Sequence, residues 1–372
     1  MRLRIAAVSD LHLGAQNSYL NIAKVRQRLV SNIRERSGGH LGGLFLVGDI
    51  LDLTVGHFPG PWLAAKEFLD SLLGDGLEVD DIFYLPGNHD HHIWVQLVEY
   101  KEILQKLDSM TRNSVTKGET ADLFSQTAYG YPTPLHGLFP ERVRKKVRFV
   151  YPFYSHVEPH TRTRFVFHHG HYFDPAITPL AEFAVKRYKE TRKIEAMNLA
   201  YIESLFYFCA WDPAVQQIEL SGYDLLQRTA LFAKHIGRLA RGQADLDKFR
   251  QWLSGKETGG KASLGQCPVE RIEAMLACRE LASQENWERD IWGFGHTHFA
   301  DYWPKEETGT ARMLFNLGGW VLNCAPQGGE DAAWSIPAVL HWDEDTGPLL
   351  ESIELSDKEK DLLVSRVYSM KR

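Results

Sequence analysis

The sequence predicts an α/β protein whose core is interrupted by a helical insertion. Apolar strand-like segments alternate with amphipathic helical segments along the first part of the chain. The strand-like segments stop at about residue 174 and return after residue 287. Alternation of strands with helices is typical of a parallel sheet joined by right-handed crossovers. The long helical stretch inside this pattern indicates an insertion within a single α/β domain.

The first half of the core is predicted from apolar runs and from helical spacing. Short apolar runs predict three strands, over residues 3–9, 44–47 and 82–85. Apolar side chains at helical spacing predict three helices, over residues 18–36, 63–73 and 93–107. In a parallel sheet, functional residues collect at the carboxyl ends of the strands. The residues that follow the predicted strands are therefore the first place to look for a site.

The rest of the chain is predicted to complete this core and to insert helices into it. Strands are predicted over residues 148–151, 164–167, 291–294, 313–317 and 338–342. Helical patterns occupy residues 180–193, 199–209, 225–239 and 269–281. We expect three parts: a core of residues 1–174 and 286–350, a helical insertion of residues 175–285 and a C-terminal tail of residues 351–372. The insertion is expected to serve as a cap over the site or as a dimer contact.

The composition is that of a globular protein, and it bears on the cellular compartment and on the kinds of partner that we expect. The chain has 372 residues, with 42 Lys and Arg against 48 Asp and Glu, so its formal net charge is −6. This balance argues against general nucleic-acid coating, which needs a basic surface, but it does not exclude a nuclease. The four cysteines form no CxxC pair, which favours a reducing compartment. The longest apolar-rich stretch, residues 199–211, is too short to span a membrane, so we expect a soluble cytoplasmic protein.

Five short segments rich in Asp, Asn and His each follow a predicted strand. They are Asp10-Leu11-His12, Gly48-Asp49-Ile50-Leu51-Asp52, Gly87-Asn88-His89-Asp90, His169-Gly170-His171 and Gly295-His296-Thr297-His298. Carboxylate oxygens combined with imidazole nitrogens suit Mn, Fe or Zn better than Ca or Mg. These donors outnumber what one ion needs, so we expect a bridging carboxylate and a two-metal site.

In this order, the segments resemble the signature of the calcineurin-like metallophosphoesterase superfamily: D-x-H, G-D-x-x-D, G-N-H-[DE], H-G-H and G-H-x-H. The resemblance implies a four-layer sandwich of two mixed β-sheets flanked by helices, here with an inserted helical subdomain. It also implies hydrolysis of phosphate mono- or diesters at two divalent transition-metal ions, with Mn expected first and Fe or Zn as alternatives. A hydroxide that bridges the two ions would attack phosphorus in line.

The resemblance also assigns roles to individual residues. The implied metal ligands are Asp10, His12 and His298 for the first ion, Asp49 for both ions, and Asn88, His169 and His296 for the second ion. His89 is the implied catalytic histidine beside the leaving-group oxygen, and Asp52 orients it. His171 is assigned to substrate binding, with a metal contact as the alternative. Its neighbour His168 is expected to be structural, because adjacent strand residues face opposite ways.

Some interpretations stay open at this point. The basic run at residues 142–148 is either a solvated strand edge or an anchor for a substrate phosphate. The aromatic stretch at residues 199–211 is either core, the wall of an apolar pocket or a dimer face.

The alternatives to a general phosphoesterase are a pyrophosphohydrolase of lipid-linked or nucleotide diphosphates, a metal-dependent nuclease and, outside catalysis, a metal-stabilised scaffold. The expected partner is a phosphate-ester substrate. Nucleic acid is not favoured, no transmembrane segment is expected, and a homodimer through the insertion is the alternative to a cap.

Overall fold

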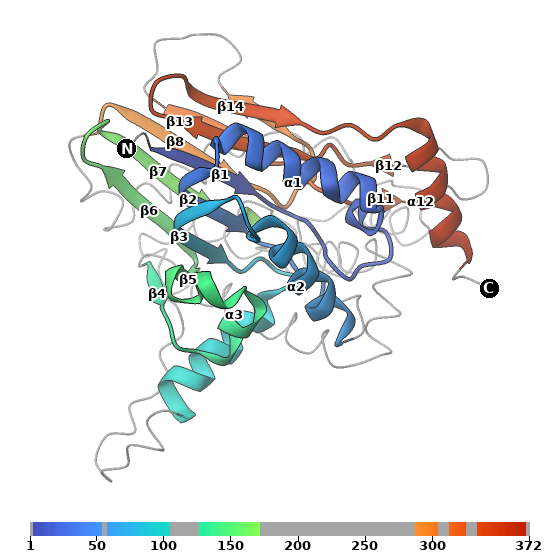
Figure 1. Cartoon of the computed structure of the whole chain (residues 1–372), viewed down its shortest axis with the longest axis horizontal. Coiled ribbons are helices and arrows are strands. Elements are labelled where there is room, and N and C mark those ends of the chain that lie inside the picture. The colour runs from blue at the N-terminus through green and yellow to red at the C-terminus, as the bar shows by residue number, and fades with distance from the viewer. Residues whose placement is uncertain are drawn as a thin grey trace, which may run out of the picture.

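The described chain forms two packed β-sheets with helices on the outer side of the larger sheet (Figure 1). The computed structural model describes residues 3–53, 58–104, 126–171, 287–303, 312–324 and 333–369. The predicted insertion, residues 175–285, lies outside these described residues. The expected α/β fold with two mixed sheets and flanking helices is confirmed.

The larger sheet has seven strands in the order β14-β13-β1-β2-β3-β5-β4. Their bounds are β1 Arg4–Val8, β2 His40–Val47, β3 Glu78–Leu85, β4 Thr127–Tyr129, β5 Val147–Tyr151, β13 Ala338–Asp343 and β14 Gly347–Ser352. The four central strands, β1, β2, β3 and β5, are parallel. Antiparallel pairs add β13 and β14 at one edge and β4 at the other.

The smaller sheet has five strands in the order β6-β7-β8-β10-β9. Their bounds are β6 Phe153–Glu158, β7 Thr163–His168, β8 Arg289–Phe294, β9 Asp301–Trp303 and β10 Arg312–Asn316. The central strands β7, β8 and β10 are parallel, and β6 and β9 pair antiparallel at the edges. A separate two-stranded sheet joins β11 (Leu322–Cys324) to β12 (Ala333–Trp334).

Among the described residues, three α-helices connect the parallel strands of the larger sheet. They are α1 (Ala23–Ser37) between β1 and β2, α2 (Gly60–Leu72) between β2 and β3, and α3 (His91–Val98) between β3 and β5. Helix α1 buries Val25, Leu29 and Ile33 at helical spacing, and it ends at Gly38, whose φ of 60° lies in the left-handed region. The predicted C-terminal tail contains the helix α12 (Asp357–Ser369).

Shorter helical segments fill the connections: η1 (Tyr19–Asn21), η3 (Pro134–Leu138), η4 (Glu141–Lys146) and the π-helix η2 (Glu99–Leu104). The described part of the helix predicted over residues 93–107 is therefore α3 followed by a wider π-helical stretch that is described to Leu104. None of the helices in the described part of the chain is long and apolar enough to cross a membrane.

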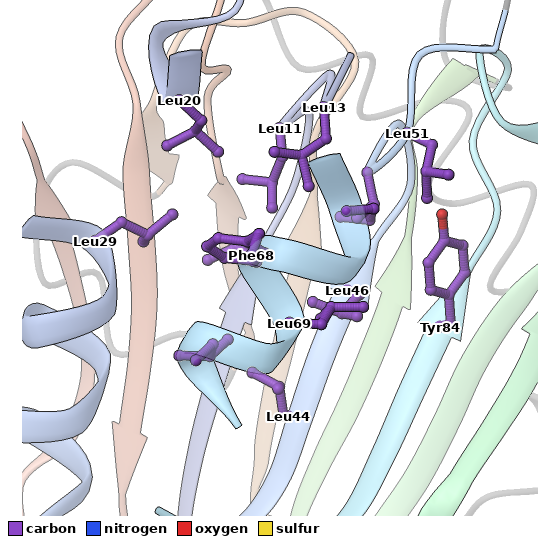
Figure 2. Close-up of a cluster of buried hydrophobic side chains, with 14 of the residues drawn as sticks. Leu11, Leu13, Leu20, Leu29, Leu44, Leu46, Leu51, Phe68, Leu69 and Tyr84 are labelled. Atoms are coloured by element: carbon purple, nitrogen blue, oxygen red, sulfur yellow. The ribbon is translucent and has the colours of Figure 1, made fainter. Parts of the chain in front are cut away.

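Two buried apolar clusters hold the layers together. One lies between the larger sheet and its helices, and Figure 2 shows members of it from α1, α2, β2 and the loops after β1 and β2. The other lies between the two sheets, where the rings of Phe45 on β2 and Phe167 on β7 stack with centroids 4.2 Å apart. The sheet-to-sheet cluster fixes the two sheets relative to each other, and with them the loops at their carboxyl ends.

Candidate metal centre

The five polar segments come together at the carboxyl ends of β1, β2, β3, β7 and β8. The side chains of all seven candidate ligands are buried, with Asp10 and His169 at 0% exposed and His298 the most exposed at 6%. Five of the seven ligand residues have a positive φ: Asp10, His12, Asp49, His296 and His298. Such conformations cost about 1–3 kcal/mol each in residues other than glycine, and they concentrate at functional sites.

The first donor group is formed by Asp10, His12 and His298, whose ligand atoms lie within 4.8 Å of one another. Nε2 of His298 is 3.3 Å from Oδ1 of Asp10. Nε2 of His12 is 3.2 Å from Nε2 of His298. Two imidazole nitrogens and a carboxylate oxygen thus face a common point, as the ligands of one transition-metal ion do.

The second donor group is formed by Asp49, His169 and His296, again within 4.8 Å. Oδ2 of Asp49 is 3.1 Å from Nε2 of His169. Asn88 joins this group through its Oδ1, which is 3.0 Å from Nε2 of His169 and 3.1 Å from Nδ1 of His296. The donors are two imidazoles, a carboxylate and an amide oxygen, a set that also suits a transition-metal ion.

Asp49 lies between the two donor groups. Its Oδ2 is 3.9 Å from Nε2 of His12 in the first group and 3.1 Å from Nε2 of His169 in the second. Its other oxygen, Oδ1, accepts a hydrogen bond of 2.7 Å from the backbone N–H of His89. The carboxylate is therefore held in place with one oxygen turned toward both groups.

Hydrogen bonds to His12 and His169 select the imidazole tautomer that can bind a cation. Nδ1 of His12 is 2.9 Å from Oδ2 of Asp52, and Nδ1 of His169 is 3.1 Å from the carbonyl oxygen of Val47. An N–H at Nδ1 in each case leaves the lone pair on Nε2, the atom that faces the centre. The residues present therefore fit two metal ions.

The electrostatics of the centre favour ionised carboxylates. Burial raises the pKa of Asp49, but the neighbouring histidines His169 and His89 outweigh burial and hold the pKa well below its ordinary value. Burial opposes charge on His169 as well, but Asp49 and Asp10 raise its pKa to about 9. A metal ion at Nε2 of His169 must therefore displace a proton.

Two glycines leave the space that ligands occupy. Gly48 has a φ of 79°, and a Cβ there would overlap the ring of His169. A Cβ at Gly295 would overlap the carboxylate of Asp10. Any larger residue at these positions would displace a candidate ligand.

Asp52 contacts two histidines rather than one. Its Oδ2 is 2.9 Å from Nδ1 of His12 and 3.5 Å from Nδ1 of His89. The rings of His12 and His89 meet edge to face with centroids 4.8 Å apart. The expected neighbour His89 is thus present, but the shorter contact of Asp52 is to the candidate ligand His12, which the sequence did not indicate.

His171 and His168 are both buried, and they differ in their neighbours. His171 lies beside the second donor group, with ring centroids 5.4 Å from His169, and its Nε2 is 3.4 Å from the hydroxyl of Tyr151. Among the described residues, His171 joins none of the groups of converging donor atoms. Nδ1 of His168 accepts a hydrogen bond of 2.8 Å from the backbone N–H of Gly170, in keeping with a structural role.

The basic run at residues 142–148 does not belong to this centre. Arg142 donates hydrogen bonds through Nη2 to the carbonyl oxygens of Leu73, Gly74 and Leu77, at the C-terminal end of α2 and the turn after it. Lys146 donates to the carbonyl oxygen of Val79, near the amino end of β3 and opposite the centre. Arg142 thus pairs with carbonyls near the end of α2 and Lys146 with a carbonyl of β3, and nothing in their placement supports a phosphate anchor.

Sequence reasoning missed Asp90 as a residue that holds the centre together. Its carboxylate accepts hydrogen bonds from the backbone N–H groups of Ile50 and Gly87, at 2.9 and 2.6 Å, and from the hydroxyl of Tyr84 at 2.5 Å. Figure 2 shows that hydroxyl directed toward Leu51. Asp90 thus ties the loop that carries Asp49 to its own loop, which carries Asn88. Its sequence signal was the acidic residue that ends the third polar segment.

The fold and the paired donor groups define a class of protein, the metal-dependent hydrolases of phosphate esters. A model of the family described as calcineurin-like phosphoesterase matches residues 3–198. The chain belongs to the calcineurin-like phosphoesterase family and is a metal-dependent phosphoesterase. The last polar segment, with His296 and His298, lies beyond the matched residues and joins the centre in the structure.

Comparison with other proteins adds two weak structural likenesses. No curated protein matches the chain. The chain is similar to a dimetal phosphatase from Danio rerio, with 11% identity and a TM-score of 0.31, over 95% of this chain and 99% of that one. It is also similar to GAP50, the anchor in the inner membrane complex of Plasmodium, with 11% identity and a TM-score of 0.32, over 99% of this chain and 94% of that one.

Proposed function

We propose that the chain hydrolyses phosphate mono- or diesters at a dinuclear centre, with Mn as the first expected metal and Fe or Zn as alternatives. The ligands of the first ion are Asp10, His12 and His298, those of the second are Asn88, His169 and His296, and Asp49 is shared. The observation that carries the proposal is the position of Asp49, whose Oδ2 lies 3.9 Å from Nε2 of His12 and 3.1 Å from Nε2 of His169.

The metal ions, when bound, supply an activated water as nucleophile and positive charge against the developing negative charge on the phosphoryl group. The protein supplies the arrangement. Asp52 and the carbonyl oxygen of Val47 orient His12 and His169. Asp90 keeps the two loops that carry Asp49 and Asn88 in register.

His89 is proposed to give a proton to the leaving-group oxygen. Its ring packs against that of His12, and it is 6% exposed, so it lies beside the first donor group. Asp52 lies 3.5 Å from Nδ1 of His89 and favours a proton on that nitrogen. The other ring nitrogen is then the one that exchanges a proton with the substrate.

His171 is proposed to contact the substrate. The support is its place beside the second donor group, with its ring 5.4 Å from that of His169 and 6.5 Å from that of His296. The hydroxyl of Tyr151 lies 3.4 Å from Nε2 of His171. A substrate phosphoryl group at the second ion would lie within reach of this imidazole.

The test is turnover of chromogenic phosphate mono- and diesters by protein loaded with Mn²⁺. We expect turnover by the wild-type chain and its loss in Asp49→Asn. Asp75→Asn, at an exposed position, is the matched control and should behave as wild type. Absence of turnover with Mn, Fe and Zn would favour the metal-stabilised scaffold. A panel of nucleotides, nucleic acids and lipid-linked diphosphates separates the pyrophosphohydrolase and nuclease alternatives.

A further inference from the structure

Ser9 carries a buried hydroxyl beside the candidate ligand Asp10. It directly follows β1, and the side chains of Ser9 and Asp10 are both 0% exposed. The Ser9 hydroxyl lies 2.5 Å from Oδ2 of Asp10 and 2.5 Å from the carbonyl oxygen of Val47, the last residue of β2. The proposed function assigns no role to this hydroxyl.

The two carboxylate oxygens of Asp10 have different surroundings. Oδ2 accepts a hydrogen bond of 2.9 Å from the backbone N–H of His296, in addition to its contact with Ser9. Oδ1 is buried and accepts no hydrogen bond in the described part of the chain. It lies 3.3 Å from Nε2 of His298 and 3.9 Å from Nε2 of His12. Oδ1 is therefore the oxygen that is left for the first ion, while the protein holds Oδ2.

The single proton of the Ser9 hydroxyl has two acceptors within reach. A hydroxyl can donate to only one of them at a time. The carbonyl oxygen of Val47 also lies 3.1 Å from Nδ1 of His169. A carboxylate that binds a metal is ionised, and an ionised acceptor forms the stronger hydrogen bond. We therefore expect Ser9 to donate to Asp10 when the first ion is bound.

The contact between Ser9 and Asp10 is enclosed by protein. A Cβ on Gly295 would lie 2.0 Å from Oγ of Ser9 and 2.0 Å from Oδ2 of Asp10, so the backbone of Gly295 packs directly against this contact. The backbone N–H of Gly295 donates to the carbonyl oxygen of His169 at 2.8 Å, which holds Gly295 in place. Bulk water therefore does not compete with Ser9 for the carboxylate.

We propose that Ser9 is a positioning residue for the first metal ion: its hydroxyl holds Oδ2 of Asp10, so that the carboxylate binds the ion through Oδ1 alone. This inference rests on the proposed function, because it takes Asp10 to be a metal ligand. Without the hydroxyl, Oδ2 keeps the backbone N–H of His296 but loses its side-chain donor, and the carboxylate can rotate. The second donor group loses no hydrogen-bond donor when Ser9 is replaced.

The experiment measures the affinity of each donor group for Mn²⁺ separately in the full-length chain, by competition with a fluorescent chelator. In an Asn88→Ala background the second group lacks a ligand, so the tightly bound ion reports on the first group. In a His298→Ala background the remaining ion reports on the second group. Ser9→Ala should lower the affinity about 10–100-fold in the first background, as is typical when a partner of a metal ligand is lost. It should leave the affinity in the second background close to unchanged.

Ser37→Ala is the matched control. Ser37 is also 0% exposed, and its hydroxyl donates to the carbonyl oxygen of Arg34 at 2.7 Å, at the end of α1. Ser37→Ala should leave both Mn²⁺ affinities unchanged. Without metal, Ser9→Ala and Ser37→Ala should unfold at similar urea concentrations, because each variant loses one buried hydroxyl.

A second readout is the visible absorption spectrum of Co²⁺ bound in the Asn88→Ala background, which reports the ligands of the ion. Ser9→Ala should change this spectrum, and Ser37→Ala should not. Equal losses of affinity in both backgrounds, or an unchanged affinity and spectrum in Ser9→Ala, would overturn the role of Ser9 while the wild-type chain still binds Mn²⁺. A wild-type chain that binds no Mn²⁺ would instead overturn the proposed function, and the role of Ser9 with it.

Discussion

Replacing Asp52 with Asn tests whether one carboxylate supports both the proposed metal ligand His12 and the proposed catalytic histidine His89. Asp52 is buried, and its Oδ2 lies 2.9 Å from Nδ1 of His12 and 3.5 Å from Nδ1 of His89. Burial raises its pKa, but His89 and His12 outweigh burial and hold the pKa far below its ordinary value. Asp52 is therefore ionised at neutral pH, and both contacts are charge-assisted.

The expected loss of metal affinity and of activity in Asp52→Asn follows from these contacts. A hydrogen bond to a charged group contributes about 1.5–3 kcal/mol, and loss of the partner that orients a metal-binding histidine typically costs about 10–100-fold in affinity or activity. An amide at position 52 can also present its NH₂ group to His12, which would move the imidazole proton to Nε2 and remove the lone pair that faces the first ion. We expect Asp52→Asn to lower the affinity for the first ion about 10–100-fold. It should also lower kcat, even at saturating metal concentration.

The assay is competition for Mn²⁺ with a fluorescent chelator, followed by kcat on a chromogenic phosphodiester as a function of metal concentration. His89→Ala is the reference that should bind both ions normally, and Asp75→Asn is the matched control for the charge change. If Asp52→Asn binds both ions with wild-type affinity and loses only kcat, Asp52 acts through His89 alone. The contact between Asp52 and His12 would then contribute nothing to metal binding.

Three further predictions concern His89, Asp90 and His341. His89→Ala should keep both metals and lose about 10²–10⁴-fold in kcat, as expected for general acid help; an emptied metal site with turnover restored on reloading would contradict its role. Asp90→Asn should lower the free energy of unfolding in urea by about 1–3 kcal/mol, because buried donors lose their acceptor, and should weaken metal binding, with Tyr84→Phe giving a smaller change; unchanged metal affinity would refute the loop-tying role of Asp90. Burial lowers the pKa of His341 from 6.5 to about 4, so the unfolded chain takes up a proton before the folded one does. Stability should therefore fall by up to about 3 kcal/mol as the pH drops from 6.5 to 4. Urea titrations of His341→Gln should lack that component, and identical pH profiles would show that His341 does not supply it.

The sequence predicted the parts of the fold in which local patterns agree with the tertiary structure. The strands that precede the polar segments are short apolar runs, and all of them were found, although β2 begins at His40 and β3 at Glu78, earlier than expected. The strands β4, β6, β9, β11, β12 and β14 were missed. β4, β9, β11 and β12 have two or three residues each, too few for alternation to stand out, and β6 and β14 carry polar side chains on the edges of their sheets.

The composition of the metal centre could be predicted, but its internal contacts could not. Each candidate ligand sits in a short segment after a strand, and parallel strands bring such segments together. The pairing of Asp52 with His12 joins residues 40 positions apart in the sequence and depends on the left-handed turns at His12 and Asp49, which no local pattern specifies. The organisation into two sheets came from the family resemblance rather than from strand periodicity, because the residue pattern does not say which strands share a sheet.

The most direct test of the central claim is the number of metal ions bound per chain. Protein stripped of metal, reloaded with Mn²⁺ and freed of excess ion should contain close to two ions per chain by elemental analysis, and Asp49→Asn should lower the occupancy of both sites, whereas Asn88→Ala should mainly empty the second. A saturated ratio near one in the wild-type chain, or no bound metal, would contradict a dinuclear centre bridged by Asp49.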